Sequence, residues 1–288
     1  MKYTRIIPLF ISCLMLTTLL ANAQTAEQGE DTQFTIYGFG RATFVWDNSD
    51  MGRSDLFVPA NIKVNTTKHP AFFIGAKQTR IGFDVKHTLA GEVLSVKVEG
   101  DFHNDASDAN GLFRMRHAYA NYRFILVGMT WSNFFDEEVN PTSVDFEGPN
   151  SSTLSRTPQV RFSMYKSKNV LSLSLENPTE SITVEGGVTV LPERFPDIIA
   201  AYRINGDFGF VKVAGLFREL RYETDKARSL PSYGITVMTA IHIAANDKLK
   251  FQGVMGTGVA RYIQGASGLN YDAITNGTDE LEELQMWG

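Results

Sequence analysis

The chain has 288 residues, in which 27 Lys and Arg face 32 Asp and Glu, giving a formal net charge of −5. With Cys13 as its only cysteine it cannot form an internal disulfide, and its acidic balance argues against nucleic-acid binding. After position 20, no apolar run approaches the roughly 20 residues that a transmembrane helix needs.

The first 23 residues have the layout of a secretory signal peptide. Lys2 and Arg5 precede a mostly apolar run at 6–20, and a small-residue cleavage site ends at Ala23. Cys13 lies within the apolar run rather than at its end, so a lipid anchor is not expected. We expect export, cleavage near Ala23, and a short periplasmic segment at 24–32. A cysteine-free mature chain fits a bacterial envelope protein.

Period-two alternation of polar and apolar residues dominates from position 33 onward, while helical spacing is nearly absent before the C-terminal tail. This alternation predicts an all-β fold without a soluble helical domain, with residues 33–288 forming one β domain. The eleven predicted strands lie at 33–46, 72–88, 92–103, 112–123, 124–134, 158–166, 169–177, 197–205, 208–221, 232–244 and 248–257, and residues 284–287 fit the start of a twelfth.

The connections between these strands alternate between short and long. Tight turns at 89–91, near 123, and at 167–168, 206–207 and 245–247 alternate with polar connections at 47–71, 104–111, 135–157, 178–196, 222–231 and after 258. Transmembrane β-barrels have short periplasmic turns and longer extracellular loops. The pattern therefore predicts a transmembrane antiparallel β-barrel. The alternative is a soluble up-and-down barrel or sandwich, which has no reason to sort its connections by length.

Each predicted strand has one polar and one apolar face. In the strand at 92–103, Val96 and Val98 alternate with Lys97, Glu99 and Asp101. Such a strand suits a wall between lipid and a water-filled lumen, and a sheet in lipid must close so that its backbone is fully paired.

The segment LFRMRHAYANYRF at 112–124 shows the alternation most clearly. Arg114 and Arg116 lie on the polar face, while strict alternation puts His117 and Tyr119 on the apolar face. Tyr119 and Trp131, near predicted strand ends, are expected in the aromatic girdles of a barrel.

The polar faces carry more basic than acidic residues. A basic lumen attracts anions, and guanidinium groups match carboxylates in bidentate geometry. The alternative is that these arginines pair with loop acids and only stiffen the lumen. The expected pore-lining residues are Arg41, Arg80, Lys97, Arg114, Arg116, Arg161, Arg203 and Arg218.

The long connection at 135–157 is the best candidate for a loop that folds inward and narrows the lumen. Acidic residues on such a loop, facing arginines on the wall, would create a transverse field that orients dipolar solutes. An exposed surface loop is the alternative. The expected constriction-loop acids are Asp136, Glu137, Glu138, Asp145 and Glu147.

Several stretches, in order along the chain, resemble the DcaP-like outer-membrane porins: QTRIGFDVKHTLAGEVLSVKVEGDF (78–102), FRMRHAYANYRFILVGMTWSNF (113–134), VDFEGPN (144–150), LENP (175–178), DIIAAYRI (197–204), LFREL (216–220) and KLKFQGVMGTGVARYI (248–263). The resemblance implies a trimeric barrel of 16 strands that passes small anions, dicarboxylates among them. It places Arg80, Arg114, Arg116 and Arg161 on a basic wall and residues 144–150 on the inward loop.

Two features depart from that family pattern. Only residues 24–31 precede the first predicted strand, so a long helical extension is not expected. The 11 or 12 predicted strands fall short of 16, so we expect that the sequence is a fragment lacking the last strands of the barrel.

No pattern in the sequence indicates catalysis. The five histidines are scattered without metal-ligand spacing, and Ser132 and Ser155 lack a nucleophile elbow. We therefore expect an outer-membrane porin without cofactor or enzymatic activity, whose partners are outer-membrane lipid, small anionic solutes and two further copies in a homotrimer. The alternatives are a non-transport outer-membrane barrel, such as a lipid hydrolase or adhesin, and a secreted soluble β-protein that binds a ligand.

Overall fold

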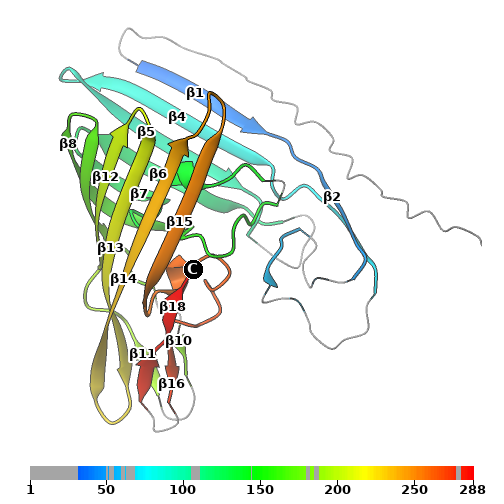
Figure 1. Ribbon diagram of the computed structural model, residues 1–288, viewed down its shortest axis with the longest axis vertical. Helices are drawn as coiled ribbons and strands as arrows, with labels where there is room; N and C mark the ends of the chain where they lie inside the picture. Colours follow the sequence, from blue (N-terminus) through cyan, green and yellow to red (C-terminus); the bar gives the residue numbers. More distant parts are fainter. Residues whose placement is uncertain are drawn as a thin grey trace, which may run out of the picture.

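The structure is a computed structural model in which residues 32–49, 51, 55–59, 62, 69–104, 111–143, 145–179, 182–184, 188–276 and 280–288 are described. The predicted signal peptide and residues 24–31 lie outside the described residues. Figure 1 shows a strongly curved sheet whose strands follow one another in chain order. Within the described residues, no helix is both long and apolar enough to cross a membrane.

The main sheet contains 13 strands, and the predicted all-β antiparallel architecture is confirmed. Among the described residues, no ladder joins β1 to β15 or β18, so the sheet is curved but not closed. The neighbouring strands, in order, are β1 (Thr32–Phe39), β4 (Arg80–Leu89), β5 (Glu92–Asp101), β6 (Arg114–Tyr122), β7 (Ile125–Trp131), β8 (Arg156–Lys166), β9 (Asn169–Glu176), β12 (Asp197–Gly206), β13 (Gly209–Glu223), β14 (Ala227–His242), β15 (Lys248–Thr257) and β18 (Gln285–Trp287), and β11 (Thr189–Leu191) pairs with β13.

The first two predicted strands are each broken into two, so the prediction of continuous strands at 33–46 and 72–88 is wrong. Their outer parts, β2 (Thr43–Asp47) and β3 (Ala71–Gly75), form a separate ribbon that leads away from the main sheet (Figure 1). At the break, the backbone N–H of Arg41 donates to Thr79 Oγ1 (3.1 Å), and Lys77 forms a buried ion pair with Asp55 (2.9 Å). These side-chain contacts replace the regular ladder.

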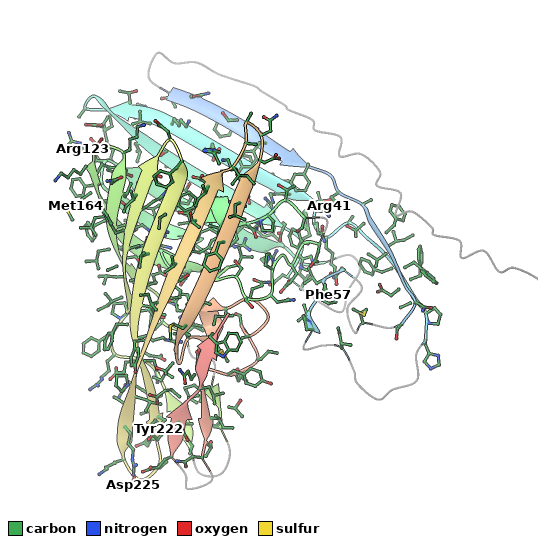
Figure 2. All side chains as sticks on the ribbon, viewed as in Figure 1. Arg41, Phe57, Arg123, Met164, Tyr222 and Asp225 are labelled. Atoms are coloured by element: carbon green, nitrogen blue, oxygen red, sulfur yellow. The ribbon has the colours of Figure 1, made fainter. Side chains whose placement is uncertain are left out.

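The tight turns lie together at one end of the sheet, as the loop pattern predicts. Ala90, Arg123 and Ser167 each have a φ between 50° and 58°, and Gly91 has a φ of 81°. Positive φ at both central residues, as at Ala90 and Gly91, is the requirement of the type I′ hairpin turn. Figure 2 shows Arg123 at this end and Asp225 at the opposite end.

The long connections contain more structure than the alternation predicts. The expected loop at 222–231 is only a short turn, because β13 continues to Glu223 and β14 begins at Ala227. At the same end, β10 (Ile182–Thr183), β16 (Ala273–Thr275) and β17 (Leu281–Glu283) form a small three-stranded sheet. The predicted start of a strand at 284–287 corresponds to β18, which pairs with β15.

The two faces of β13 show how the sheet is built. Lys212 and Arg218 lie buried on the concave face, while Val213 and Phe217 on the convex face are 41% and 52% exposed. Beyond Phe217 the convex face becomes charged at Glu219. An apolar convex band with charged residues beyond it is typical of a strand that faces lipid hydrocarbon.

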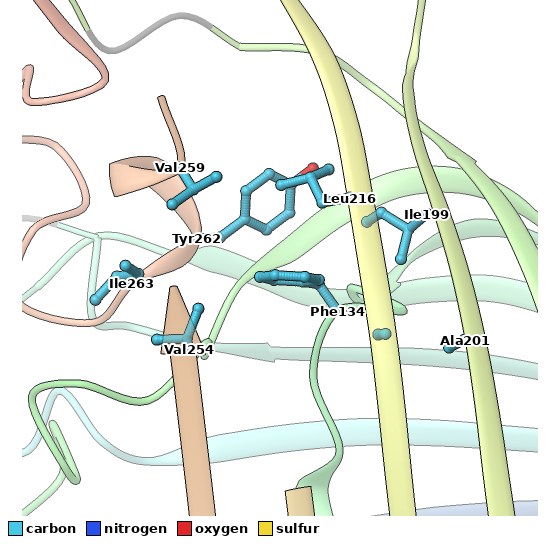
Figure 3. Packing of buried hydrophobic residues seen from close by; sticks show 9 residues of the cluster. Phe134, Ile199, Ala201, Leu216, Val254, Val259, Tyr262 and Ile263 are labelled. Atoms are coloured by element: carbon cyan, nitrogen blue, oxygen red, sulfur yellow. The ribbon is translucent and has the colours of Figure 1, made fainter. Parts of the chain in front are cut away.

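The largest apolar core fills the concave side of β12, β13 and β15. Phe134, from the connection between β7 and β8, packs edge-on against Tyr262 at a ring-centroid distance of 5.6 Å (Figure 3). Tyr262 belongs to the short 3-10 helix η3 (Ala260–Tyr262), and Ile199 and Leu216 supply the strand side of this core. Side chains from the connections therefore fill the concave face over β12, β13 and β15.

Candidate functional site

The connection between β7 and β8, described at residues 132–143 and 145–155, crosses the concave face. Asp136 caps the short 3-10 helix η2 (Glu137–Val139) by accepting the N–H of Glu138 at 3.2 Å. Arg203 of β12 donates to Asp136 (2.6 Å) and to Glu138 (2.5 Å), and Lys250 of β15 donates to the carbonyl of Asn140 (2.6 Å). The alternative of an exposed surface loop is therefore wrong; we call this segment the inward loop.

A buried carboxylate fixes the start of the inward loop. Glu176 of β9 accepts the backbone N–H of Asn133 at 2.8 Å and the hydroxyl of Ser174 at 3.0 Å. Lys212 of β13 donates to the carbonyl of Phe135 at 2.5 Å. These contacts hold the loop against β9 and β13 before it reaches Arg203.

A cavity of about 650 Å³ lies between the inward loop and the side of the sheet formed by β1 and β4 to β8. Glu137, Asp145 and Glu147 line it from the loop. The structure thus brings together four of the eight predicted basic residues and three of the five predicted acids. The basic residues that line it are Arg41, Arg80, Arg114, Arg116 and Arg156.

Three of these arginines share two carboxylates of β5. Arg114 binds Asp101 through two hydrogen bonds of 2.9 and 2.7 Å, a bidentate charge-assisted pair. Arg116 contacts Glu99 at 2.8 Å and Asp101 at 3.0 Å, and Arg80 lies 3.4 Å from Glu99. For these three arginines the acidic partners belong to the wall and not to the loop. The alternative of pairing with loop acids holds for Arg203, which contacts Asp136 and Glu138.

A β-bulge changes the faces of β6. The pairing of Glu99 with His117 is followed by that of Gly100 with Met115, so Arg116 is an extra residue. As a result, Arg116 and His117 both lie on the concave face, where His117 Nδ1 is 3.0 Å from the Thr130 hydroxyl. The prediction that His117 and Tyr119 lie on the outer face, with Tyr119 in a girdle, is wrong because one inserted residue reverses the alternation.

Arg156 and Trp131 form a stacked pair at the edge of the cavity. The guanidinium carbon lies 4.4 Å from the indole centroid, and the two residues are register partners of β8 and β7. Trp131 also contacts Phe135, at a ring-centroid distance of 5.2 Å, so the prediction of an outer girdle position is wrong. Sequence reasoning missed Arg156, which fell at the end of a predicted loop.

The remaining predicted basic residues occupy other places on the concave face. Arg161 donates to Gln159 (2.9 Å) and to the carbonyl of Trp131 (2.5 Å). Lys97 lies 3.4 Å from Asp84 and 4.7 Å from the ring centroid of Tyr37. Neither lines the arginine cavity.

Arg218 does not line the cavity, which corrects its predicted role. It is 1% exposed and forms buried ion pairs with Asp272 (2.8 Å) and Asp197 (3.4 Å). Arg261 joins the cluster through Asp197 (3.1 Å), and Tyr262 donates to the same carboxylate (2.8 Å). Burial raises the pKa of Asp272, against the attraction of Arg218, and raises the pKa of Tyr262.

The predicted acids divide into two groups. Asp136 and Glu138 hold the loop to Arg203, whereas Asp145 accepts the N–H of Glu147 at 3.2 Å within the part that lines the cavity. Among the described residues, no group of three or more His, Cys, Asp or Glu side chains is placed to hold a metal ion.

Comparison with known proteins places these features in a family context. The family model described as DcaP outer membrane protein matches residues 17–275. The outer membrane channel DcaP of Acinetobacter baumannii has a similar fold, with a TM-score of 0.77 and 22% identity over 90% of this chain and 73% of that one. OmpT, an outer membrane protein of Vibrio cholerae, gives a TM-score of 0.40 and 13% identity over 81% of this chain and 79% of that one. No curated protein matches.

Proposed function

Because the chain belongs to the DcaP outer membrane protein family, we propose that it is a porin through which small hydrophilic solutes, above all anions, diffuse passively. The observation that carries the proposal is the arginine-lined cavity beneath the inward loop. We place the protein in the bacterial outer membrane after cleavage near Ala23, as a homotrimer without cofactor or catalytic activity.

The charges around the cavity support a preference for anions. The arginines gather on the sheet wall, whereas Glu137, Asp145 and Glu147 lie across from them on the loop. A solute carboxylate is drawn to the wall, and a surround of low dielectric focuses the field. A small dicarboxylate can exchange its hydration for guanidinium contacts, because the fork of Arg matches a carboxylate. The inward loop then sets the size limit.

A lipid-hydrolysing barrel has less support. A nucleophilic serine needs access to substrate and an adjacent base. Ser132, the first residue of the inward loop, is fully buried, and its hydroxyl accepts the N–H of Phe134 at 3.0 Å. The hydroxyl of Ser132 therefore stabilises the conformation of the inward loop.

Swelling of protein-containing vesicles tests the proposal. We expect faster swelling in a four-carbon dicarboxylate than in a four-carbon sugar alcohol of similar size, because the wall raises the local anion concentration. Protein-free vesicles are the control. Equal rates for the two solutes would contradict the anion preference, and no swelling in either would contradict the porin.

A further inference from the structure

Arg156 differs from the other arginines of the cavity wall in its partners. Arg80, Arg114 and Arg116 contact Glu99 or Asp101. Within the described part of the chain, Arg156 makes no ion pair or hydrogen bond with any carboxylate, and its Nη1 is buried without a hydrogen-bond partner.

The stack on Trp131 leaves the donors of Arg156 available. An indole face contacts the flat face of a guanidinium, whereas the N–H groups point outward in its plane. A carboxylate approaches a guanidinium along that in-plane edge and accepts two parallel hydrogen bonds. Arg156 therefore keeps its anion-binding edge while Trp131 fixes its orientation.

Other unpartnered groups around the same cavity are mostly donors. Trp131 Nε1 and Arg80 Nε are also buried without a hydrogen-bond partner, and both residues line the cavity. On the loop side, the side-chain amide oxygen Oδ1 of Asn140 is an unpartnered acceptor. Buried polar groups normally find partners, so a wall with a surplus of donors favours a ligand that supplies acceptors.

The surrounding charge favours an anion over a neutral acceptor. Arg156 lines the cavity, and the positive charges of Arg116 and Arg114 act on it more strongly than the negative charge of Asp101. Like charges brought together in this way repel each other and are relieved by an anion. A cation at this position would meet the same repulsion.

We propose that Arg156, held on Trp131, forms an anion-binding subsite that takes one carboxylate group of a passing solute or a small monovalent anion. This proposal rests on the proposed function, because it assigns part of the anion preference of the same cavity to one residue. Arg156 is then a specificity-determining residue, because removing it takes away a positive charge without leaving an acid unpaired.

Trp131 gives a direct measurement of this subsite. The chain has three tryptophans, so Trp46 and Trp287 are replaced by Phe and Trp131 fluorescence is followed in the detergent-solubilised full chain. Iodide, an anionic quencher, is compared with caesium, a cation, and with neutral acrylamide. We expect iodide to quench Trp131 several-fold more strongly than caesium, and succinate to protect against iodide.

Matched variants separate binding from folding. Arg156→Gln should remove the advantage of iodide while acrylamide quenching stays the same, and Arg156→Lys should restore part of it. Arg123→Gln, at an exposed turn where Arg123 lies 3.7 Å from Glu92, is the control and should behave as the parent. Iodide quenching that persists unchanged in Arg156→Gln would overturn the subsite.

The two proposals fail in different ways. An anion-selective channel whose selectivity and iodide quenching do not depend on Arg156 would overturn the subsite and leave the porin standing. Iodide quenching that depends on Arg156, in a protein that passes no ions, would support the subsite and overturn the porin.

Discussion

Replacing Arg218 with methionine should lower the free energy of unfolding by about 3–5 kcal/mol, the range for breaking a buried ion pair from one side. Arg218 is almost fully buried between Asp197 and Asp272, which are themselves fully buried. Methionine fills much of the volume but leaves Asp272 without its cation and Asp197 with Arg261 alone. Urea unfolding of the protein in phospholipid vesicles measures the change.

Arg221→Met is the matched control for this prediction. Arg221 lies on the same strand, but on the other face, where it donates to the carbonyl of Pro192 at 2.7 Å. We expect this variant to stay within about 1 kcal/mol of the parent, as surface polar contacts are worth little. Adding Asp272→Asn to Arg218→Met should recover part of the loss, because one unpaired charge is removed. Similar losses in the two arginine variants would contradict the buried cluster.

Replacing Arg203 with glutamine should loosen the inward loop and raise the single-channel conductance. Arg203 is the shared partner of Asp136 and Glu138, and it stacks on Phe210 at 3.9 Å. Losing charge-assisted hydrogen bonds costs about 1.5–3 kcal/mol, which favours conformations with the loop away from β12. Conductance in planar bilayers gives the channel readout, and urea unfolding gives the stability.

Lys168→Gln serves as the control for the loop. Lys168 pairs with Asp207 at 3.2 Å among the exposed turns, at the opposite end of the sheet from the long connections. Neither conductance nor stability should change in this variant. A conductance of Arg203→Gln equal to that of the parent would show that the contacts of Arg203 do not set the channel width.

Strand alternation predicts the two faces of the sheet but not what covers them. It correctly places Arg218 of β13 on the concave side. The same face carries Ala214 and Leu216, which pack against Phe134 from a distant connection. A periodic pattern within one strand has no information about segments that fold over it, so the burial of Arg218 could not be read from the sequence.

Two local irregularities also escape sequence reasoning. The bulge at Arg116 adds one residue to β6, and a one-residue shift moves each later side chain to the other face. Arg156 begins β8, two positions before the predicted start, where the inward loop joins the sheet. The position of Arg156 in the cavity depends on its stack with Trp131, which lies 25 residues earlier in the chain (156 minus 131).

The length and charge of the connection predict that it folds inward, but they do not predict which wall residue holds it. Acids on a long loop between basic strands indicate a contact with the wall. The structure brings Glu138 to Arg203, 65 residues away, and leaves Arg114 and Arg116 with acids of their own sheet. Several arginines could have paired with the loop acids, and only the folded structure shows which of them does.

The reversal potential across a planar bilayer with a potassium chloride gradient tests the central claim most directly. The account predicts a reversal potential with the sign expected for a chloride-selective channel. This potential should become smaller when Arg114 and Arg116 are both replaced by alanine, because the change leaves Glu99 and Asp101 short of cations. A potential of the sign set by potassium, or one that is unchanged in the double variant, would contradict it.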